Sequence, residues 1–278
     1  MDLQKIFEKL DAYFGAKDMA GAGKYLETTF QEATVREDTQ CQLALANELI
    51  GYYRDMADFE KSFAYCRTAY NIACGSDFMG TNEYATTLLN IANAYRAGGE
   101  LTAAENFYSI VFELYTQLLP EDDMRFAGLH NNIALLYMEK KEYAATCEHL
   151  EAALMITSVN PDAYLEAAIS HANLASVMLK SGEELTILMS HAEDAVKIFE
   201  AYDAQDDYHY SAALSTLAEA KYHTGGFNEA AQLFIRAAAA REKFMGRDEV
   251  YKGMVRSAMK SYEDFGKHDK AKALEAML

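Results

Sequence analysis

The sequence predicts an all-α protein, an α-solenoid of about seven antiparallel helix-turn-helix repeats. Within residues 129–155, two apolar stripes at helical spacing flank a short polar segment, Glu139–Glu142, which predicts a helical hairpin. Breaks of the same kind recur every 40 to 43 residues along the chain. The composition agrees, because 51% of the residues are hydrophobic while only two are proline, too few turn breakers for a β-rich fold.

The break between paired helices can be aligned along the whole chain. Its markers are Lys17, Ala57, Gly99, Lys141, Gly182, Gly225 and Gly266. Glycine at four of these seven positions is typical of a helix C-terminus where the backbone adopts positive φ. We therefore expect a tight turn of one kind at every break.

Columns of similar residues accompany these breaks. Seven residues before each break stands a small or apolar side chain: Leu10, Ile50, Ala92, Ala134, Ala175, Ala218 and Met259. Four residues before it, five of the seven repeats carry tyrosine. The columns predict a single repeat domain over residues 1–278, with repeats at approximately 1–36, 37–79, 80–121, 122–161, 162–206, 207–247 and 248–278.

Two further details follow from this alignment. The fifth repeat is less regular, because after Gly182-Glu183-Glu184 its second helix needs about one extra residue to stay in register. Acidic residues at Asp122–Asp123, Asp206–Asp207 and Asp248–Glu249 stand where first helices are expected to begin, and negative charge is favoured at helix N-termini.

The order of the columns resembles the tetratricopeptide repeat family: small residue, aromatic, turn, aromatic, then alanine. The resemblance covers essentially the whole chain. Because the repeat is longer than the family's usual period of about 34 residues, it is closest to the kinesin-light-chain-like subclass. Residues 80–90 and 129–137 look like that subclass. The resemblance implies a right-handed superhelix whose first helices line a concave groove.

Composition narrows the class of function. The net charge of −18 disfavours a nucleic-acid partner, since such proteins usually present a basic surface. The four cysteines show no CxxC pair and suit a reducing compartment. No apolar stretch is long enough to span a membrane, and the N-terminus lacks the pattern of a signal peptide. We expect a soluble, cytoplasmic protein.

The resemblance assigns one face of the first helices to the groove. The predicted peptide-binding residues are Asn90, Asn93, Arg96, Asn131, Asn132, Asn173, Ser176, Lys180, Thr216, Glu219, His223, Arg256 and Lys260.

Three of them, Asn90, Asn132 and Asn173, occupy one column in consecutive repeats. Because asparagine is a mediocre helix former, helix propensity does not explain why it recurs in this column. Its amide donates and accepts together, which suits an extended peptide backbone. In the resembled family, asparagine in this column holds bound peptide. The alternative is that each amide only caps or bridges neighbouring helices.

Other polar groups carry weaker signals. Lys252, Arg256 and Lys260 share one helix face, which could receive a carboxylate or could simply be solvated. His130 and His171 stand in one column of adjacent repeats, too far apart to share a zinc ion. No catalytic motif is present. We therefore expect no enzyme activity, no cofactor and no metal.

These observations predict a non-catalytic interaction module that binds an extended protein or peptide segment in the groove. One alternative is a peptide-sensing regulator that acts through protein contacts. Another is a homo-oligomeric assembly factor, a homodimer through the C-terminal helix at residues 267–278, whose apolar stripe no further helix covers.

Overall fold

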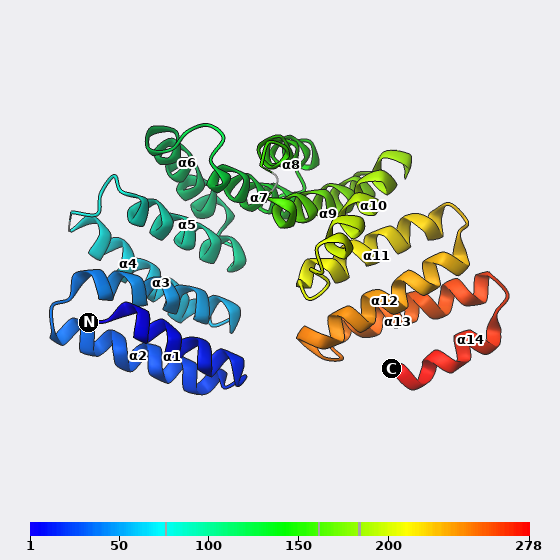
Figure 1. Ribbon diagram of the computed structural model, residues 1–278, viewed down its shortest axis with the longest axis horizontal. Helices are drawn as coiled ribbons and strands as arrows, with labels where there is room; N and C mark the ends of the chain where they lie inside the picture. Colours follow the sequence, from blue (N-terminus) through cyan, green and yellow to red (C-terminus); the bar gives the residue numbers. More distant parts are fainter. Residues whose placement is uncertain (76, 161, 183–184) are drawn as a thin grey trace. The chain divides into compact units, whose positions relative to one another are not determined.

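The computed structural model describes residues 1–75, 77–160, 162–182 and 185–278, and these residues form helices and no strand (Figure 1). The chain divides into two compact units, Met1–Glu121 (unit 1) and Asp122–Leu278 (unit 2). The division falls at the expected boundary between the third and fourth repeats. The single repeat domain stays a prediction, and each unit is described by itself.

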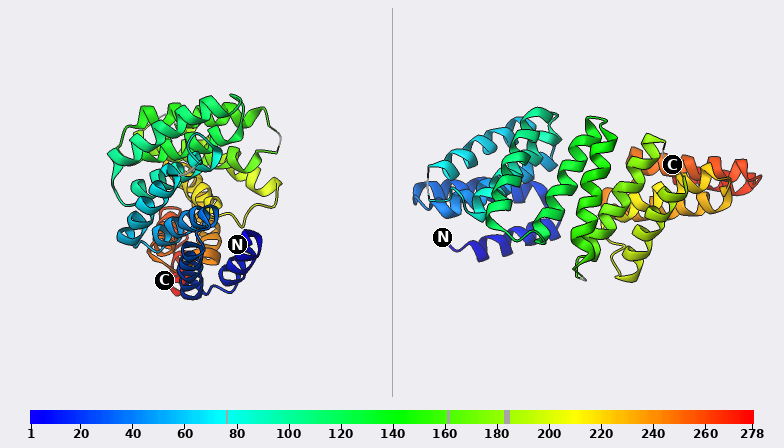
Figure 2. Two further views of the ribbon diagram at one scale, coloured as in Figure 1. Left: turned by 90° about the vertical axis from the view of Figure 1, so that its left-hand side faces the viewer. Right: turned by 90° about the horizontal axis from the view of Figure 1, so that it is seen from above.

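The described residues of unit 1 form three helical hairpins, in which each helix contacts the next one along the chain (Figures 1 and 2). Its helices are α1 (Leu3–Gly15), α2 (Met19–Val35), α3 (Thr39–Asp55), α4 (Phe59–Cys74), α5 (Asn82–Ala97) and α6 (Leu101–Leu118).

In unit 2, the residues that the structure describes form four further hairpins. Its α-helices are α7 (Met124–Glu139), α8 (Tyr143–Ser158), α9 (Tyr164–Ser181), α10 (Leu185–Ala201), α11 (Tyr208–His223), α12 (Phe227–Met245), α13 (Glu249–Asp264) and α14 (His268–Ala273). A 3₁₀ turn, η1 (Leu274–Met277), follows α14.

First helices of consecutive repeats also contact each other, as α3 contacts α5, α7 contacts α9, and α9 contacts α11. The small column is buried: Ala92, Ala134, Ala175 and Ala218 are each at most 1% exposed. The all-α fold built from repeated hairpins is thus confirmed.

Every break residue has a positive φ, between 56° and 84°. In the turn at Gly99, the Gly99 N–H donates to the carbonyl of Arg96 at 3.0 Å, and the Glu100 N–H donates to Tyr95 at 2.9 Å. This pair of bonds is the Schellman motif, which satisfies carbonyls left open at a helix C-terminus. The same pair closes the turns at Lys17, Ala57, Lys141, Gly225 and Gly266.

The register places the aromatic column against the second helix of the same hairpin. Ring pairs lie across it with centroids 5.5 to 5.7 Å apart, at Tyr13–Tyr25, Tyr53–Tyr65, Tyr95–Phe107 and Tyr137–His149. Such pairs add to the area burial that holds each hairpin closed.

The fifth repeat shows the expected register shift. In the other repeats, a buried residue stands five residues after the break. In the fifth repeat the residue at that place, Ile187, is 49% exposed, and the next residue, Leu188, is fully buried. Glu183 and Glu184, where the sequence predicts the extra residue, lie outside the described residues.

The expected acidic helix starts are N-caps. The side chains of Asp123, Asp207 and Asp248 accept backbone N–H groups at the first turns of α7, α11 and α13.

Near the C-terminus, the apolar stripe is partly turned inward. Ala271 and Leu274 are buried in the core of unit 2, Met277 packs against it, and Leu278 is 45% exposed. The homodimer through this segment stays a prediction.

The positive φ at Ala57 predicts the sign of a substitution. Ala57→Gly should raise the free energy of unfolding by about 1 kcal/mol, because a Cβ disfavours the left-handed region. Gly99→Ala should lower it by a similar amount, since a Cβ there meets no atom within 4 Å and only the backbone is affected.

Thermal unfolding followed by circular dichroism checks both changes. Ala239→Gly, on the exposed face inside α12, is the control and should destabilise by about 1 kcal/mol. A loss of stability in Ala57→Gly like that in Ala239→Gly would contradict the turn assignment.

Candidate functional site

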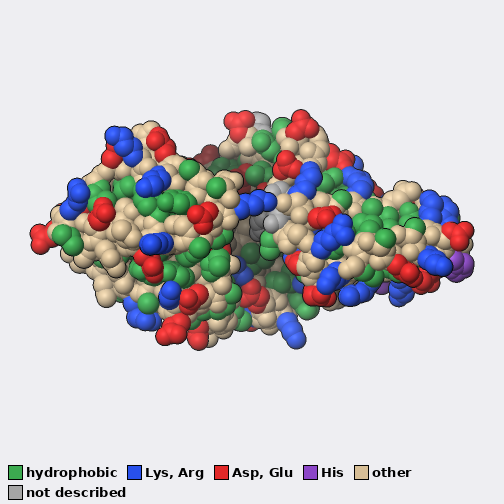
Figure 3. All heavy atoms as spheres, turned by 90° about the horizontal axis from the view of Figure 1, so that it is seen from below, with side chains coloured by type: hydrophobic (Ala, Val, Ile, Leu, Met, Phe, Trp, Pro, Cys, Tyr) green, Lys and Arg blue, Asp and Glu red, His purple; other side chains and the backbone are tan. Residues whose placement is uncertain are grey.

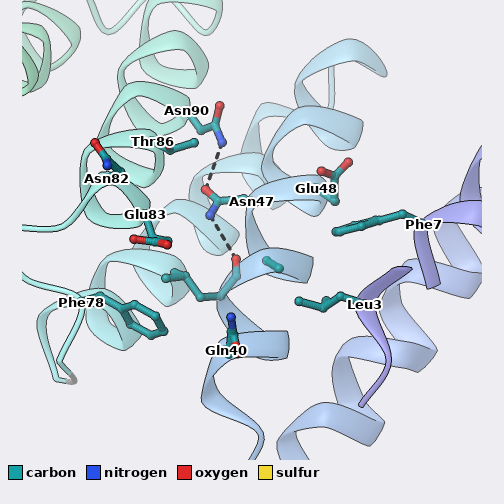
Figure 4. A pocket seen from close by; sticks show the side chains of 12 residues that line it. Leu3, Phe7, Gln40, Asn47, Glu48, Phe78, Asn82, Glu83, Thr86 and Asn90 are labelled. Atoms are coloured by element: carbon teal, nitrogen blue, oxygen red, sulfur yellow. Dashed lines mark hydrogen bonds between the residues drawn. The ribbon is translucent and has the colours of Figure 1, made fainter. Parts of the chain in front are cut away.

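In unit 1, a hollow of about 420 Å³ lies over the first helices α1, α3 and α5 (Figure 4). It is lined by Leu3, Phe7, Gln40, Leu43, Ala44, Asn47, Glu48, Phe78, Asn82, Glu83, Thr86 and Asn90. Of the predicted groove residues, Asn90 is the one in this lining. The hollow therefore lies over first helices, the helices that the resemblance assigns to the groove.

A chain of hydrogen bonds fixes the side chain of Asn90. Asn90 Nδ2 donates to Asn47 Oδ1 at 3.1 Å. Asn47 Nδ2 in turn donates to Thr87 Oγ1 at 3.0 Å and to the carbonyl of Leu43 at 3.1 Å. The Thr87 hydroxyl donates to the carbonyl of Glu83 at 2.9 Å.

This chain leaves one orientation for each amide. Because the Thr87 hydroxyl proton is used on Glu83, Thr87 can only accept from Asn47. The Asn47 oxygen must then be the acceptor for Asn90. As a result, this network does not use the Asn90 oxygen or its second N–H, and Asn90 lies in the lining of the hollow (Figure 4).

A second hollow of about 260 Å³ continues along α3. It shares Asn47, Glu48 and Asn90 with the first hollow and extends to Phe14, Met19, Gly51, Tyr52, Arg54 and Asp55. Together the two hollows form a groove in unit 1, which we call the α3 groove, and Asn90 lies at its middle.

Unit 2 repeats one contact of this network. Asn131 Nδ2 donates to Ser170 Oγ at 2.9 Å, linking α7 to α9 as Asn47 and Thr87 link α3 to α5. Asn131 and Asn47 each stand ten residues before their breaks. Asn173 stands three residues after Ser170, and Asn90 likewise stands three residues after Thr87. Asn132 donates to the carbonyl of Gly128 at 3.0 Å on its own helix.

Three predicted residues meet in a hollow of about 250 Å³ between α11 and α13 in unit 2. Its lining includes Glu219, His223 and Lys260, with Tyr222 between them. The Lys260 ammonium lies 5.2 Å from the centroid of the Tyr222 ring. Burial raises the pKa of the Glu219 carboxyl, and the charges of His223 and Lys180 oppose that rise.

The other predicted residues lie outside these hollows. Asn93 Oδ1 accepts the Tyr108 hydroxyl at 2.6 Å, within the α5–α6 hairpin. Thr216 is only 9% exposed. Arg256 is exposed and 3.9 Å from Glu249. Arg96 and Ser176 are half-buried. The binding roles of the whole predicted set stay predictions.

Several groove residues escaped the sequence prediction. Leu3 and Phe7 belong to the first repeat, where no polar column marks the inner face, and Phe78 lies in the link before α5. Glu48 had a signal, since it stands nine residues before its break, in the column of Asn90, Asn132 and Asn173.

In each of two consecutive hairpins of unit 2, a pair of histidines joins the first helix to the second. His130 and His149 approach with their Nδ1 atoms 2.9 Å apart, and His171 and His191 with theirs 2.8 Å apart. Burial lowers the pKa of all four imidazoles, that of His130 to about 4. Each hydrogen bond needs one neutral ring nitrogen as acceptor.

Metal ions and membranes are two further classes of partner. Within the described residues, no three His, Cys, Asp or Glu side chains gather so that they could hold a metal ion. In that part of the chain, no helix combines the length and apolarity that a membrane span requires.

Comparison with known proteins finds one matching family model. A family model described as tetratricopeptide repeat matches residues 85–123 and 211–248. No curated protein sequence matches the chain. These two segments are tetratricopeptide repeats.

Solved structures of tetratricopeptide-repeat proteins have the same fold. Repeats of a Podosopora anserina protein described as a putative kinesin light chain are 18% identical, with a TM-score of 0.56, over 73% of this chain and 97% of that one. The resemblance to kinesin-light-chain-like repeats is thereby confirmed.

The apo form of the quorum sensor NprR from B. thuringiensis aligns over all of this chain and 87% of its own, with a TM-score of 0.65 and 14% identity. NprR in complex with its cognate peptide NprX aligns over 98% and 76%, with a TM-score of 0.62 and 19% identity. At such identities the likeness is one of fold.

The buried histidines predict a loss of stability in acid. Unfolded histidine has a pKa near 6.5, so between about pH 6.5 and 4 these histidines bind more protons in the unfolded chain than in the folded one. The contribution of these histidines to the free energy of unfolding is therefore fully present above about pH 6.5, and it decreases as the pH falls through this window.

A double substitution tests this within one hairpin. His130→Leu with His149→Phe installs the residues that the third repeat carries at the same places, Leu88 and Phe107. The fall in Tm between pH 7.5 and pH 5 should be smaller than in the parent. An equal fall would contradict the prediction, and His223→Gln, at an exposed histidine, is the control.

Proposed function

We propose that this protein is a non-catalytic interaction module that binds an extended peptide segment of a partner along its first helices. One observation carries the proposal. The bonds through Asn47 and Thr87 fix the Asn90 amide in the lining of the α3 groove and leave its oxygen and one N–H unused by that network.

The chemistry of an amide suits such a ligand. An extended peptide presents N–H and C=O groups that have no partner within its own chain. A fixed asparagine side chain can accept from one and donate to the other without losing rotamer freedom on binding. Thr87 is fully buried and Asn47 is half-buried, so the groups that position Asn90 are themselves held by packing.

The fold supports the same conclusion. Tetratricopeptide repeats generally serve as interaction scaffolds rather than as catalysts. NprR, which has this fold, has been solved with its cognate peptide NprX. We extend the proposal to unit 2, where the remaining residues would contact a segment of the same or another partner: Asn131, Asn132, Asn173, Ser176, Lys180, Thr216, Glu219, His223, Arg256 and Lys260.

A peptide selection tests the α3 groove. Random 12-residue peptides displayed on phage are selected on the full chain, and the selected sequences are synthesised for fluorescence anisotropy. Asn90→Ala should weaken binding about tenfold, as expected when one or two hydrogen bonds of about 1 kcal/mol are lost. Asn106→Ala, at an exposed position on α6, is the control and should bind as the parent does.

Equal affinity of the parent and Asn90→Ala for every selected peptide would refute binding at this groove. The asparagine column of unit 2 is tested with the double change Asn132→Ala plus Asn173→Ala. Peptides selected on the parent that bind this double variant equally well would exclude a role for that column.

A peptide-sensing regulator is the second candidate, and the division of the chain into two compact units favours it. A sensor changes its conformation when the ligand binds, because the ligand has different affinities for two states. Small-angle scattering with a selected peptide should then show a smaller radius of gyration. An unchanged radius at saturating peptide would favour a static scaffold.

A further inference from the structure

The lining of the first hollow contains two carboxylates, Glu48 and Glu83, and no basic side chain. Among the described residues, neither carboxylate has an ion pair or a hydrogen bond. Across the surface in Figure 3, by contrast, acidic side chains are interspersed with basic ones. The hollow therefore carries negative charge that the protein does not neutralise.

The two carboxylates differ in what the fold requires of them. Glu83 lies in the first turn of α5, where the helix dipole stabilises a negative charge. Glu48 lies in the middle of α3, and the residues three and four positions away are Ala44, Leu45, Gly51 and Tyr52, none of them charged. Helix formation gives no reason for its charge.

The register gives no structural reason either. In the third, fourth and fifth repeats the position of Glu48 is occupied by Asn90, Asn132 and Asn173. A neutral amide therefore satisfies the packing of this column.

The surroundings of Glu48 favour a cation over water. Burial raises the pKa of its carboxyl, and the negative charge of Asp11 raises it further. A partly buried carboxylate gains strongly from a charged hydrogen-bond donor. The Phe7 side chain of α1 extends toward Glu48 in Figure 4, and an aromatic ring adds a favourable contact for a cation.

Apolar surface lies beside this charged corner. Leu3 on α1, together with Leu43 and Ala44 on α3, lines the same hollow. A lysine or arginine side chain combines a cationic head with an apolar stem, and it matches such a site better than a small inorganic cation does.

We propose that the hollow is a subsite for one lysine or arginine side chain of the bound peptide. Its cationic head lies between the Glu48 carboxylate and the Phe7 ring, and its stem lies over Leu43 and Ala44. The inference rests on the proposed function, since Asn90 holds the backbone of the same peptide.

The experiment uses the peptides selected on the full chain. Parent ligands should share a basic residue at one fixed position. Replacing it with norleucine, which keeps the stem and removes the charge, should weaken binding about tenfold or more, as expected for a charged hydrogen bond. In Glu48→Gln, the native and norleucine peptides should bind within about twofold of each other.

Glu83→Gln is the matched control, because it removes a carboxylate from the opposite wall of the same hollow. It should retain most of the preference for the basic residue. The inference is overturned if the selected peptides share no basic residue, or if the norleucine penalty is as large in Glu48→Gln as in the parent.

The outcomes separate this inference from the proposed function. If the peptides bind Asn90→Ala more weakly but share no basic residue, the result supports the groove and refutes the subsite. If the peptides bind Asn90→Ala as tightly as the parent, peptide binding at the α3 groove itself is refuted. The Tm of Glu48→Gln should equal or exceed that of the parent, since no described hydrogen bond or ion pair uses this carboxylate and its burial costs solvation.

Discussion

The structure depends on one turn, the left-handed residue that closes each helical hairpin. The same two backbone hydrogen bonds close the six breaks whose flanking residues are all described, and every break residue has a positive φ. A Schellman motif reverses the chain in a fixed number of residues. The second helix of each repeat therefore begins at the same place relative to the first, and the columns that flank the break face one another.

This constant register brings the groove residues together. Asn47 stands ten residues before its break, and Thr87 stands twelve before the next. Packing of α3 against α5 joins them at 3.0 Å, and Asn131 meets Ser170 at 2.9 Å by the same rule. The link spans two repeats, so the side chain that it orients, Asn90, depends on the packing of neighbouring repeats rather than on one hairpin.

The same register explains what could be predicted from the sequence. The breaks, the alanine column, the acidic helix starts and the shift at Leu188 are properties of the chain's own spacing, and they could be aligned directly. These predictions need only the period and the chemistry of the turn. The assignment of Asn90 to the groove needed the resemblance as well, which implies that the first helices line the groove.

Other features depend on contacts between columns, which the alignment does not show. His130 and His171 share a column, whereas their partners, His149 and His191, stand across the hairpin in the column of aromatic rings. The role of Asn47 depends on which amide oxygen is used, and that follows from the hydroxyl of Thr87. Phe7 and Phe78 approach the groove from an irregular first repeat and from a link, where no column exists.

Glu48 connects these two kinds of information. Its column is occupied by amides in three later repeats, which shows that the fold needs only a polar group there. A partly buried carboxylate in the same place loses solvation, and no basic side chain in the lining of the hollow compensates for that loss. Amides can hold a peptide backbone of any sequence, whereas a charge discriminates between side chains. A groove that combines Asn90 with Glu48 would therefore use one to bind and the other to select.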